Sequence, residues 1–446
     1  MGHLHGVGGP QGWSLRARAA LTSVLLALLF LLVYPTTNWI TAQRTDVGTW
    51  YFEWERAIPF VPWLIVPYMS IDLFFIVAPF LCIDSIELRT LARRIAFAIL
   101  AAGACFLLMP LHLAFPRPRA DGWLGEIFTA FQGMDQPYNL FPSLHITLRT
   151  ILASVYARHT RGLLRLAVHV WFSLIGFSTV LTYQHHVMDI VGGFMLAGYC
   201  FYFFRERSAR LPVVKNVRLG WYYAAGAAFL LALAAARPPW SVLFAWPGTA
   251  LAIVAAAYWG VGPGIYRKRD GVLPLSTRFA LGPVLIGQNL SLLYYRRQCR
   301  SWDEVVPHLL IGRTLNSAEA DRAIKSGVTA VLDLTAEFSE AAPFRATKYF
   351  SLPVLDLTAP TMEQLDQAVE FIAEHTHAGT VYVHCKIGYS RSAAVVGAYL
   401  LSVGQAATAE EAVHMLRKAR PSIVVRPEVW NALTVFALAG QKRERA

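Results

Sequence analysis

Cys385 and Arg391 stand six residues apart, between an apolar run typical of a buried strand and a run typical of a helix. The N-terminus of a helix attracts anions, and the same field lowers the pKa of a nearby thiol. A guanidinium at this spacing can return to the bound anion and donate to two of its oxygens. The combination predicts a thiolate that attacks a phosphate ester.

The loop between these two residues has the features of a phosphate cradle. A glycine within it permits a positive φ, and backbone N–H groups can then point inward at the anion. Ser392 is expected to donate to the cysteine sulfur and help it leave when water resolves the phospho-enzyme. We assign phosphate binding to the loop residues Lys386, Ile387, Gly388, Tyr389 and Ser390.

The leaving oxygen needs a proton donor from another loop. Asp356 follows a predicted strand and precedes a turn that contains Pro360, so we favour it as the general acid. Asp333 is the alternative, but it lies within a strand-like run. A buried structural cysteine beside an ordinary helix start is the competing interpretation of Cys385. The preceding His384 and the strand–loop–helix context disfavour it.

A second group of polar residues interrupts apolar segments, where polar side chains are costly and are expected to be functional. His185 and Asp189 are four residues apart and share one face if their segment is helical. The carboxylate can fix the imidazole tautomer and increase its nucleophilicity toward phosphorus. His145 can protonate the leaving alkoxide. His186 has no carboxylate at the matching offset and stays outside this site.

Phosphate binding in the second group is assigned to Arg117, Ser143 and Arg149. Arg149 lies one turn beyond His145 and is expected to hold Asp189, Asp72 or the phosphate, among which the sequence does not choose.

Two alternatives remain for this second group. The first is a zinc site built from His145, His185 and Asp189, and the second is a purely structural network. No further histidine or cysteine has obvious ligand spacing, so we expect no metal and no cofactor.

Composition places the two groups in different surroundings. Of 446 residues, 55% are hydrophobic and only 15% are charged, with a mean hydropathy of +0.42. Typical soluble domains have about 25% charged residues, so part of this chain must lie in lipid. Apolar runs of roughly the length of a bilayer span predict about eight transmembrane helices. They cover 19–43, 57–83, 95–116, 140–157, 166–184, 187–204, 219–236 and 238–266.

The fold class follows from this pattern. Residues 1–270 are predicted to form an all-α polytopic membrane domain. Residues 301–446 alternate strand and helix patterns, which predicts a soluble α/β domain with a central mixed sheet. Residues 271–300 are predicted to be an amphipathic linker. Within it, 279–295 is uncharged but interrupted by Gly, Pro, Gln and Asn, so we expect an interfacial or docking segment rather than a ninth span.

Charge sets the predicted orientation. Most basic residues between the apolar runs fall on the side of the N-terminus, which predicts cytoplasmic N- and C-termini in a plasma or inner membrane. This bias explains the net charge of +12 without nucleic acid. Five cysteines without paired spacing indicate reduced thiols, which suits a cytoplasmic thiolate. The polar group in the membrane domain would then lie at the outer face.

Residues 301–440 resemble a dual-specificity protein tyrosine phosphatase domain. The loop "HCKIGYSRS" is close to the "HCKAGRSRS" pattern of phosphatidylglycerophosphate-type lipid phosphatases in that superfamily. Lys386 matches the pattern. The resemblance implies that Cys385 is the nucleophile and Arg391 the phosphate binder. It also implies that Asp356 is the general acid and Ser392 the hydroxyl that assists the thiolate.

Residues 90–205 resemble the type-2 phosphatidic acid phosphatase superfamily, through "FPSLH" and "QHHVMDIVGG". The resemblance implies that His185 forms a phospho-histidine, with Asp189 as its partner and His145 as the acid. Pro110 and Thr179 stand where phosphatases of the superfamily carry a lysine and an arginine. These differences favour the branch of sphingomyelin- and inositol-phosphoceramide-synthase-like phosphotransferases.

The two resemblances together predict a bifunctional membrane enzyme that acts on lipid phosphates, with a histidine site outside and a cysteine site inside. Its expected partners are a phospholipid or lipid-phosphate substrate and the bilayer, and the sequence does not predict an oligomeric state. One alternative is a headgroup phosphotransferase joined to a headgroup-phosphate phosphatase in one biosynthetic route. The other is a membrane-anchored protein phosphatase.

Overall fold

The computed structural model describes residues 13–206 and 211–444, and the outer ends of the two predicted domains lie beyond these ranges. The chain forms two compact units, Met1–Ser208 and Ala209–Ala446. The first unit is helical. The second combines further apolar helices with an α/β domain that contains Cys385.

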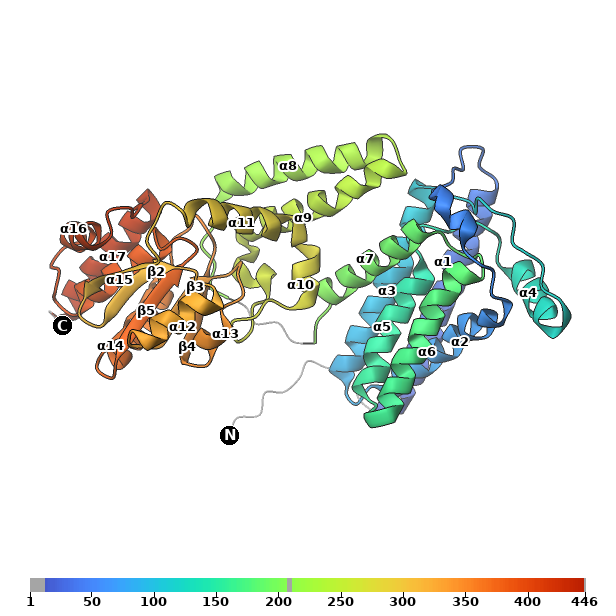
Figure 1. The fold of residues 1–446 in the computed structure, drawn as a ribbon, viewed down its shortest axis with the longest axis horizontal. Coiled ribbons are helices and arrows are strands. Elements are labelled where there is room, and N and C mark those ends of the chain that lie inside the picture. The colour runs from blue at the N-terminus through green and yellow to red at the C-terminus, as the bar shows by residue number, and fades with distance from the viewer. Residues whose placement is uncertain (1–12, 207–210, 445–446) are drawn as a thin grey trace. The chain divides into compact units, whose positions relative to one another are not determined.

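The first unit is a bundle in which α1, α2, α3, α5 and α6 lie side by side (Figure 1). Its core is apolar and includes Ile95, Ile99 and Ile151, all fully buried. Leu31 and Leu32 on α1 are among the large apolar side chains that the bundle leaves exposed, as expected of a surface that faces lipid. The helices are α1 (Leu15–Ala42), α2 (Ile65–Leu81), α3 (Ser85–Leu108), α4 (Gly122–Met134), α5 (Leu144–Arg158), α6 (Gly162–Leu181) and α7 (Val187–Phe203).

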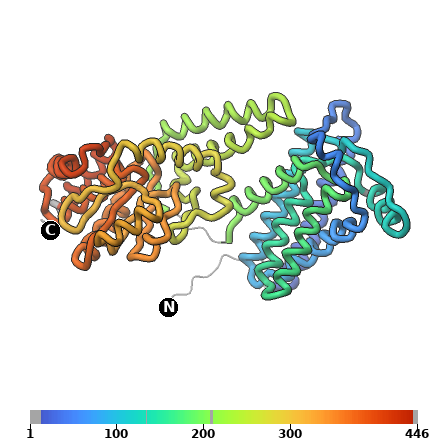
Figure 2. Tube along the Cα trace, viewed as in Figure 1, coloured from blue at the N-terminus to red at the C-terminus, as the bar shows by residue number. Residues whose placement is uncertain are grey.

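The second unit begins with an apolar hairpin, traced in Figure 2 before the chain enters the α/β domain. Its first arm is α8 (Val217–Ala236). The second arm runs through η3 (Trp240–Phe244), α9 (Ala245–Ala256) and η4 (Ala257–Val261). The connection to the first strand contains η5 (Pro263–Tyr266), α10 (Leu275–Ala280) and α11 (Gly282–Tyr295). Trp246 on α9 donates its indole N–H to the carbonyl of Phe279 at 3.0 Å, which ties this connection to the hairpin.

The α/β domain has a five-stranded sheet in the order β1-β2-β5-β3-β4. The antiparallel pairing of β1 with β2 and the parallel pairing of the other strands make it the mixed sheet that the sequence predicts. The strands are β1 (Trp302–Val306), β2 (Leu309–Arg313), β3 (Val328–Thr335), β4 (Lys348–Val354) and β5 (Thr380–Cys385).

Helices cover both faces of this sheet because side chains alternate along its strands. Val381 and Val383 on β5 pack in the larger core, whereas Tyr382 between them packs with the smaller one. The larger core contains residues of α14 (Met362–Thr376), α15 (Arg391–Ser402), α16 (Ala409–Ala419) and α17 (Pro427–Glu444). The smaller core contains residues of α12 (Ser317–Lys325) and α13 (Ala342–Arg345).

Eight helices, α1 to α3 and α5 to α9, overlap the eight predicted apolar runs, although α3 begins ten residues before its run of 95–116. Six of the described helical segments are long and apolar enough to cross a bilayer. The helices α5 and α7 have 15 and 17 residues, fewer than the ~20 that a bilayer core requires, so the number of spans stays a prediction. Residues 279–295 contain α11, whose 14 residues are also short for a span.

Candidate active sites

Cys385 ends the central strand β5, and Arg391 begins α15, so the phosphate-cradle loop lies between a strand end and a helix N-terminus as predicted. Neighbouring segments hold the loop by its carbonyl groups. Thr314 donates its hydroxyl to the carbonyl of Cys385 at 3.3 Å and its backbone N–H to that of Lys386 at 3.2 Å. Arg420 donates to the carbonyl of Ile387 at 3.0 Å. With its carbonyls held from outside, the loop can present its N–H groups to an anion.

Gly388 has a φ of +76°, as expected from its place in the loop. A side chain here would be strained in that conformation, and its Cβ would also collide with the backbone of Gly312 on β2. Both the backbone conformation and the close approach of β2 therefore require glycine at this position.

Burial and charge act in opposite directions on the thiol of Cys385. Burial alone would raise its pKa. The guanidinium of Arg391, the nearby hydroxyl of Ser392 and the backbone N–H groups of Ser392 and Tyr389 lower it, and the net pKa is below the ordinary thiol value. This environment favours the thiolate, which is the nucleophilic form.

Arg391 is fixed by a carboxylate that the sequence did not single out. Its two terminal nitrogens donate to the two oxygens of Glu337 at 3.1 and 2.7 Å, and both side chains are buried. A further bond runs from Arg391 to the carbonyl of Val354 at 2.9 Å. These contacts hold the guanidinium at the mouth of the loop, so little rotamer entropy remains to be lost on phosphate binding.

Of the two candidate acids, Asp356 lies beside Arg391 and the cysteine loop. One carboxylate oxygen is 3.3 Å from Arg391, the other is 3.9 Å from Lys386, and the side chain is 29% exposed. Asp333 is fully buried and accepts hydrogen bonds from Lys268, Tyr349 and Thr335. Burial would raise the pKa of Asp333, but Lys268 and its other partners lower it below the ordinary value. A carboxylate held ionised cannot serve as the acid, so the geometry favours Asp356.

Asp333, Glu340 and His384 form a buried cluster whose ligand atoms lie close enough together to hold a metal ion. Lys268 already brings its ammonium group to Asp333 within this cluster. The Nε2 atom of His384 lies 2.6 Å from Glu340, and these carboxylates raise the pKa of His384 although burial would lower it. The cations present therefore offset the acidic charge, and the cluster fits an ionic network behind the cysteine loop better than a metal site.

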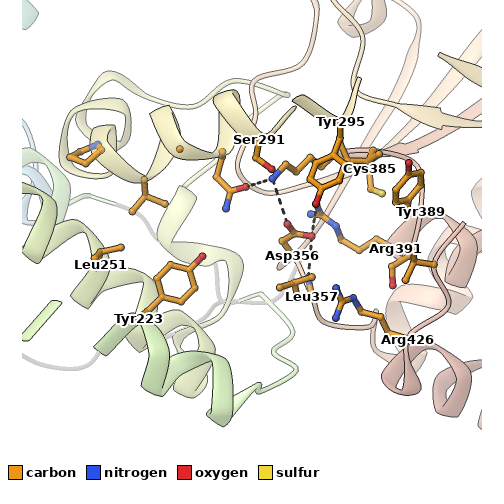
Figure 3. A pocket seen from close by; sticks show the side chains of 18 of the residues that line it. Tyr223, Leu251, Ser291, Tyr295, Asp356, Leu357, Cys385, Tyr389, Arg391 and Arg426 are labelled. Atoms are coloured by element: carbon orange, nitrogen blue, oxygen red, sulfur yellow. Dashed lines mark hydrogen bonds and ion pairs between the residues drawn. The ribbon is translucent and has the colours of Figure 1, made fainter. Parts of the chain in front are cut away.

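A cavity of about 720 Å³ opens at Cys385 and extends to the apolar hairpin. Figure 3 shows Cys385, Tyr389 and Arg391 on one side, Tyr223 and Leu251 on the other, and Asp356 with Leu357 between them. The further lining residues include Pro247, Pro283, Val284, Gly287, Gln288, Ser291, Lys386, Ile387, Ser390 and Arg426. The amide oxygen of Gln288 on α11 accepts from Lys386 at 2.6 Å. The cavity therefore joins a polar phosphate site to the side chains of two membrane-type helices.

In the first unit, the predicted site of His185, Asp189 and His145 lies at one end of the bundle. The Nδ1 atom of His185 is 3.5 Å from the carboxylate of Asp189, and both side chains are buried. His145 on α5 interacts electrostatically with His185 and stacks on Tyr68 at a centroid distance of 4.0 Å. Its Nε2 atom is buried and finds no hydrogen-bond partner among the described residues. The three predicted catalytic residues thus lie in one region.

Ser143 caps α5 and links it to α7. Its side chain accepts from the N–H of Ile146, and its own N–H donates to the carbonyl of Asp189 at 2.9 Å. A Cβ at Gly193 would lie 2.6 Å from the Ser143 carbonyl oxygen, so α7 can approach this closely only with glycine there. This contact fixes the distance between the helix of His145 and that of Asp189.

The two predicted membrane arginines have protein partners. Arg117 donates to the carbonyl of Asp135 at 3.0 Å and lies 3.5 Å from its carboxylate. Asp135 in turn interacts electrostatically with His185, which places Arg117 near the histidine site. Arg149 donates to the carbonyl of Phe172 at 2.6 Å, an option that the sequence did not suggest.

The side chain of His186 contacts a different carboxylate, whereas its backbone N–H donates to the carboxylate of Asp189 at 2.7 Å. Its Nδ1 lies 3.0 Å from Glu55, and its Nε2 accepts from the N–H of Ala114 at 3.1 Å. Glu55 also accepts from the N–H of Val187, so this buried pair fixes the turn that carries the histidines.

Comparison with known proteins finds a family match in each of the two units. The sequence profile of the dual specificity phosphatase catalytic domain matches residues 311–438, and that of the PAP2 superfamily matches residues 15–203. Phosphatidylglycerophosphate phosphatase PTPMT2 of Arabidopsis thaliana is 31% identical over 178 residues, which cover 38% of this chain and 77% of the relative. The chain belongs to the dual-specificity phosphatases, fused to a PAP2-superfamily domain.

Other relatives match the phosphatase domain as well. Phosphatidylglycerophosphate phosphatase PTPMT1 of Arabidopsis thaliana is 28% identical, with 38% of this chain covered. The chain spans 54% of the length of that relative. A crystal structure of PTPMT1 in complex with PI(5)P is 25% identical, with a TM-score of 0.30, and covers 32% of this chain and 99% of its own.

Three residues that contact Arg391 or the cysteine loop were not found by the sequence analysis. Glu337 lies in the segment after β3, and Arg420 directly follows α16, each far from the cysteine loop along the chain. Gln288 comes from the predicted linker. Only the uncharged character of 279–295 hinted that this segment docks on something, and no spacing linked any of the three to Cys385.

Proposed function

We propose that this membrane protein is a lipid phosphatase, in which Cys385 removes a terminal phosphate from a phospholipid headgroup at the cytoplasmic face of a plasma or inner membrane. The observation that carries the proposal is the cavity that runs from Cys385 to Tyr223 and Leu251 on the apolar hairpin. A phosphate bound in the loop leaves the rest of its molecule beside candidate transmembrane helices. The names of the relatives point to the same class, phospholipids whose headgroup carries a phosphomonoester.

The chemistry proceeds in two balanced steps. The thiolate of Cys385 attacks phosphorus, the bond from phosphorus to the lipid oxygen breaks, and Asp356 gives its proton to that leaving oxygen. Arg391 and the loop N–H groups stabilise the charge on the transferring phosphoryl group. Asp356, now a carboxylate, takes a proton from water as the water oxygen attacks phosphorus. The S–P bond breaks, inorganic phosphate leaves, and Ser392 donates to the regenerated thiolate.

A protein substrate fits this cavity less well. Leu251, Pro247 and Val284 line the end away from Cys385, and an acyl chain or glycerol backbone is complementary to such a surface. Tyr389 stands where the related lipid phosphatases carry a basic residue. Arg426 and Lys386 supply positive charge at the cavity for an anionic headgroup.

The PAP2-superfamily unit is proposed to act at the outer face on a lipid phosphate, with His185 as the nucleophile. Its imidazole would attack phosphorus, and His145 would protonate the oxygen that leaves. Transfer of the phosphoryl group to an alcohol rather than to water would place the unit in the phosphotransferase-like branch. In that case the two units could act in one route, where the phosphatase removes a phosphate from the headgroup that the transferase supplies.

The test uses the full-length protein reconstituted in vesicles, offered phospholipids with a terminal phosphomonoester and, separately, a phosphotyrosine peptide. We expect phosphate release from the lipid to depend on Cys385 and to be lost in C385S. Loss of peptide dephosphorylation in C385S, with lipid turnover unchanged, would instead support the membrane-anchored protein phosphatase.

The His185→Ala variant tests the outer site in the same vesicles and in cells. Accumulation of two successive lipid intermediates in H185A and C385S cells would support one route. Accumulation of two unrelated lipids would contradict it. An H185A protein with unchanged lipid turnover would show that this site takes no part.

A further inference from the structure

The loop of the proposed general acid is held by both ends of the apolar hairpin. Tyr258, in η4, donates its hydroxyl to the backbone carbonyl of Asp356 at 2.9 Å. Asn216, the N-cap of α8, donates its side-chain amide to the carbonyl of Leu357 at 3.1 Å. The N–H of Asn216 also donates to the carbonyl of Tyr258 at 3.1 Å, so the two ends are bonded to each other. The backbone carbonyls of Asp356 and Leu357 therefore both accept hydrogen bonds from the place where the two ends of the hairpin meet.

The backbone at this point needs external support. Leu357 has a φ of +59°, a conformation that non-glycine residues adopt rarely and that persists only where the surroundings hold it. Tyr258 is buried, and its ring stacks on Tyr223 at a centroid distance of 5.5 Å and an interplanar angle of 11°. The hydroxyl of Tyr258 is thus presented from a rigid position.

The side chain of Asp356 accepts one backbone hydrogen bond, from the adjacent N–H of Leu357 at 3.1 Å, in the same segment that the hairpin holds. It is 29% exposed and reaches Arg391 at 3.3 Å and Lys386 at 3.9 Å, and both are groups that a phosphate would also engage. When phosphate takes over these cations, the backbone contacts to the hairpin remain to define where the carboxyl group lies. A displacement of about 1 Å can cost a large factor in rate, because proton transfer needs hydrogen-bond distance.

We propose that Asn216 and Tyr258 are positioning residues for the general acid of the Cys385 site. The apolar hairpin then contributes to the phosphatase reaction. The inference rests on the proposed function, because it presumes Asp356 as the acid. It goes beyond that function because both positioning residues lie outside the phosphatase catalytic domain matched at 311–438.

The test compares two substrates whose leaving groups differ in their need for a proton. A phosphate ester of an acidic phenol departs with little help from an acid, whereas an alkyl phosphate such as a glycerol phosphate ester needs the proton in the transition state. We expect Y258F, in the full-length protein, to lower kcat for the alkyl phosphate about 10-fold and to change kcat for the aryl phosphate less than about twofold. General acids contribute about 10²–10⁴-fold, so a tenfold loss corresponds to partial misplacement.

A second variant and a matched control separate this effect from damage to the fold. N216D keeps the oxygen that caps α8 at Leu219 but loses the donor to Leu357, and it should give the same selective loss. Y222F removes a hydroxyl from the same helix, one that accepts from Arg218 and does not line the cavity. It should leave both substrates unchanged.

The outcomes distinguish the inference from the function on which it rests. Equal losses for both substrates in Y258F and N216D, or no loss for either, would overturn the positioning role while C385S still abolishes turnover. D356N should reproduce the selective loss with a larger factor. If D356N affected both substrates equally, Asp356 would not be the acid and the inference would fail with it.

Discussion

At the residue scale, the chemistry of Cys385 is set by neighbours that override its burial. A thiol in an apolar interior is poorly ionised, but Arg391 and the donors of the loop lower the pKa of Cys385. Arg391 can do this because Glu337 fixes its two terminal nitrogens from the other side. The carboxylate therefore acts on the nucleophile through the arginine, although it touches neither the sulfur nor the phosphate loop in the contacts described.

This arrangement predicts how alkylation of Cys385 depends on pH. Because its folded pKa is lowered, the rate of reaction with iodoacetamide should reach half its maximum at a pH below that of an ordinary thiol. S392A removes one donor to the sulfur and should shift that midpoint upward, by about one unit or less for a single hydrogen bond. Mass spectrometry of the Cys385 peptide measures the rate. An unchanged midpoint in S392A would mean that the hydroxyl does not stabilise the thiolate.

A second prediction concerns Glu337. E337Q keeps the shape of the side chain but removes the charge that holds Arg391, so we expect kcat/KM to fall about 10-fold or more. The buried guanidinium would also lose its buried ionic partner and keep only the partly exposed Asp356, at a cost of about 3–5 kcal/mol for a broken buried pair. Steady-state kinetics and urea unfolding measure the two effects. Full activity in E337Q would show that the loop alone orients Arg391.

At the element scale, the cysteine loop was predictable because strand, loop and helix are contiguous in the sequence. The identities of Cys385, Gly388 and Arg391 and the apolar run before them mark the motif locally. Glu337 and Gln288 reach the same site from distant segments, and nothing in their neighbourhood signals it. The choice between Asp333 and Asp356 was made on local grounds, and burial beside Lys268 supplies the physical reason against Asp333.

In the helices of the first unit, too, contacts between distant segments could not be predicted from the sequence. Their apolar runs are evident in composition, but which partner a polar side chain takes depends on packing. Arg149 was given carboxylates and phosphate as options, whereas it donates to a backbone carbonyl of α6. The histidine group was predictable in outline because "QHHVMDIVGG" supplies His185, Asp189 and the glycines in one segment. Gly193 then allows α7 to meet the capping residue of α5.

The loop glycine gives a prediction with an internal control. Gly388 and Gly404 have similar φ values of +76° and +70°, but only at Gly388 would a Cβ meet another backbone. G404A should therefore lower the free energy of unfolding by about 1–2 kcal/mol from conformational strain alone. G388A should lower it by more and should abolish phosphate release, because the loop must shift away from β2. Equal effects on stability and activity would contradict the close approach.

At the scale of the whole molecule, the proposed function requires the cysteine and histidine sites to face opposite compartments. The cysteine site favours the cytoplasmic one. A low-pKa thiolate is best kept in a reducing cytoplasm, and the basic residues cluster between apolar runs on the side predicted to face it. With eight spans, the phosphatase domain returns to the side of the N-terminus. A ninth span at 279–295 would place Cys385 outside.

Labelling with a membrane-impermeant maleimide decides between these arrangements. Glu126, on α4 between the third and fourth apolar runs, and Glu370, on α14, are both exposed. We expect E126C to react in intact cells, because the charge bias places this segment outside. E370C should react only after permeabilisation, and the unaltered chain, with its five native cysteines, supplies the background. Because α11 has 14 residues where a span needs about 20, E370C should stay protected in intact cells. Its labelling there would make 279–295 a membrane-crossing segment and would move the thiolate chemistry to the outer face.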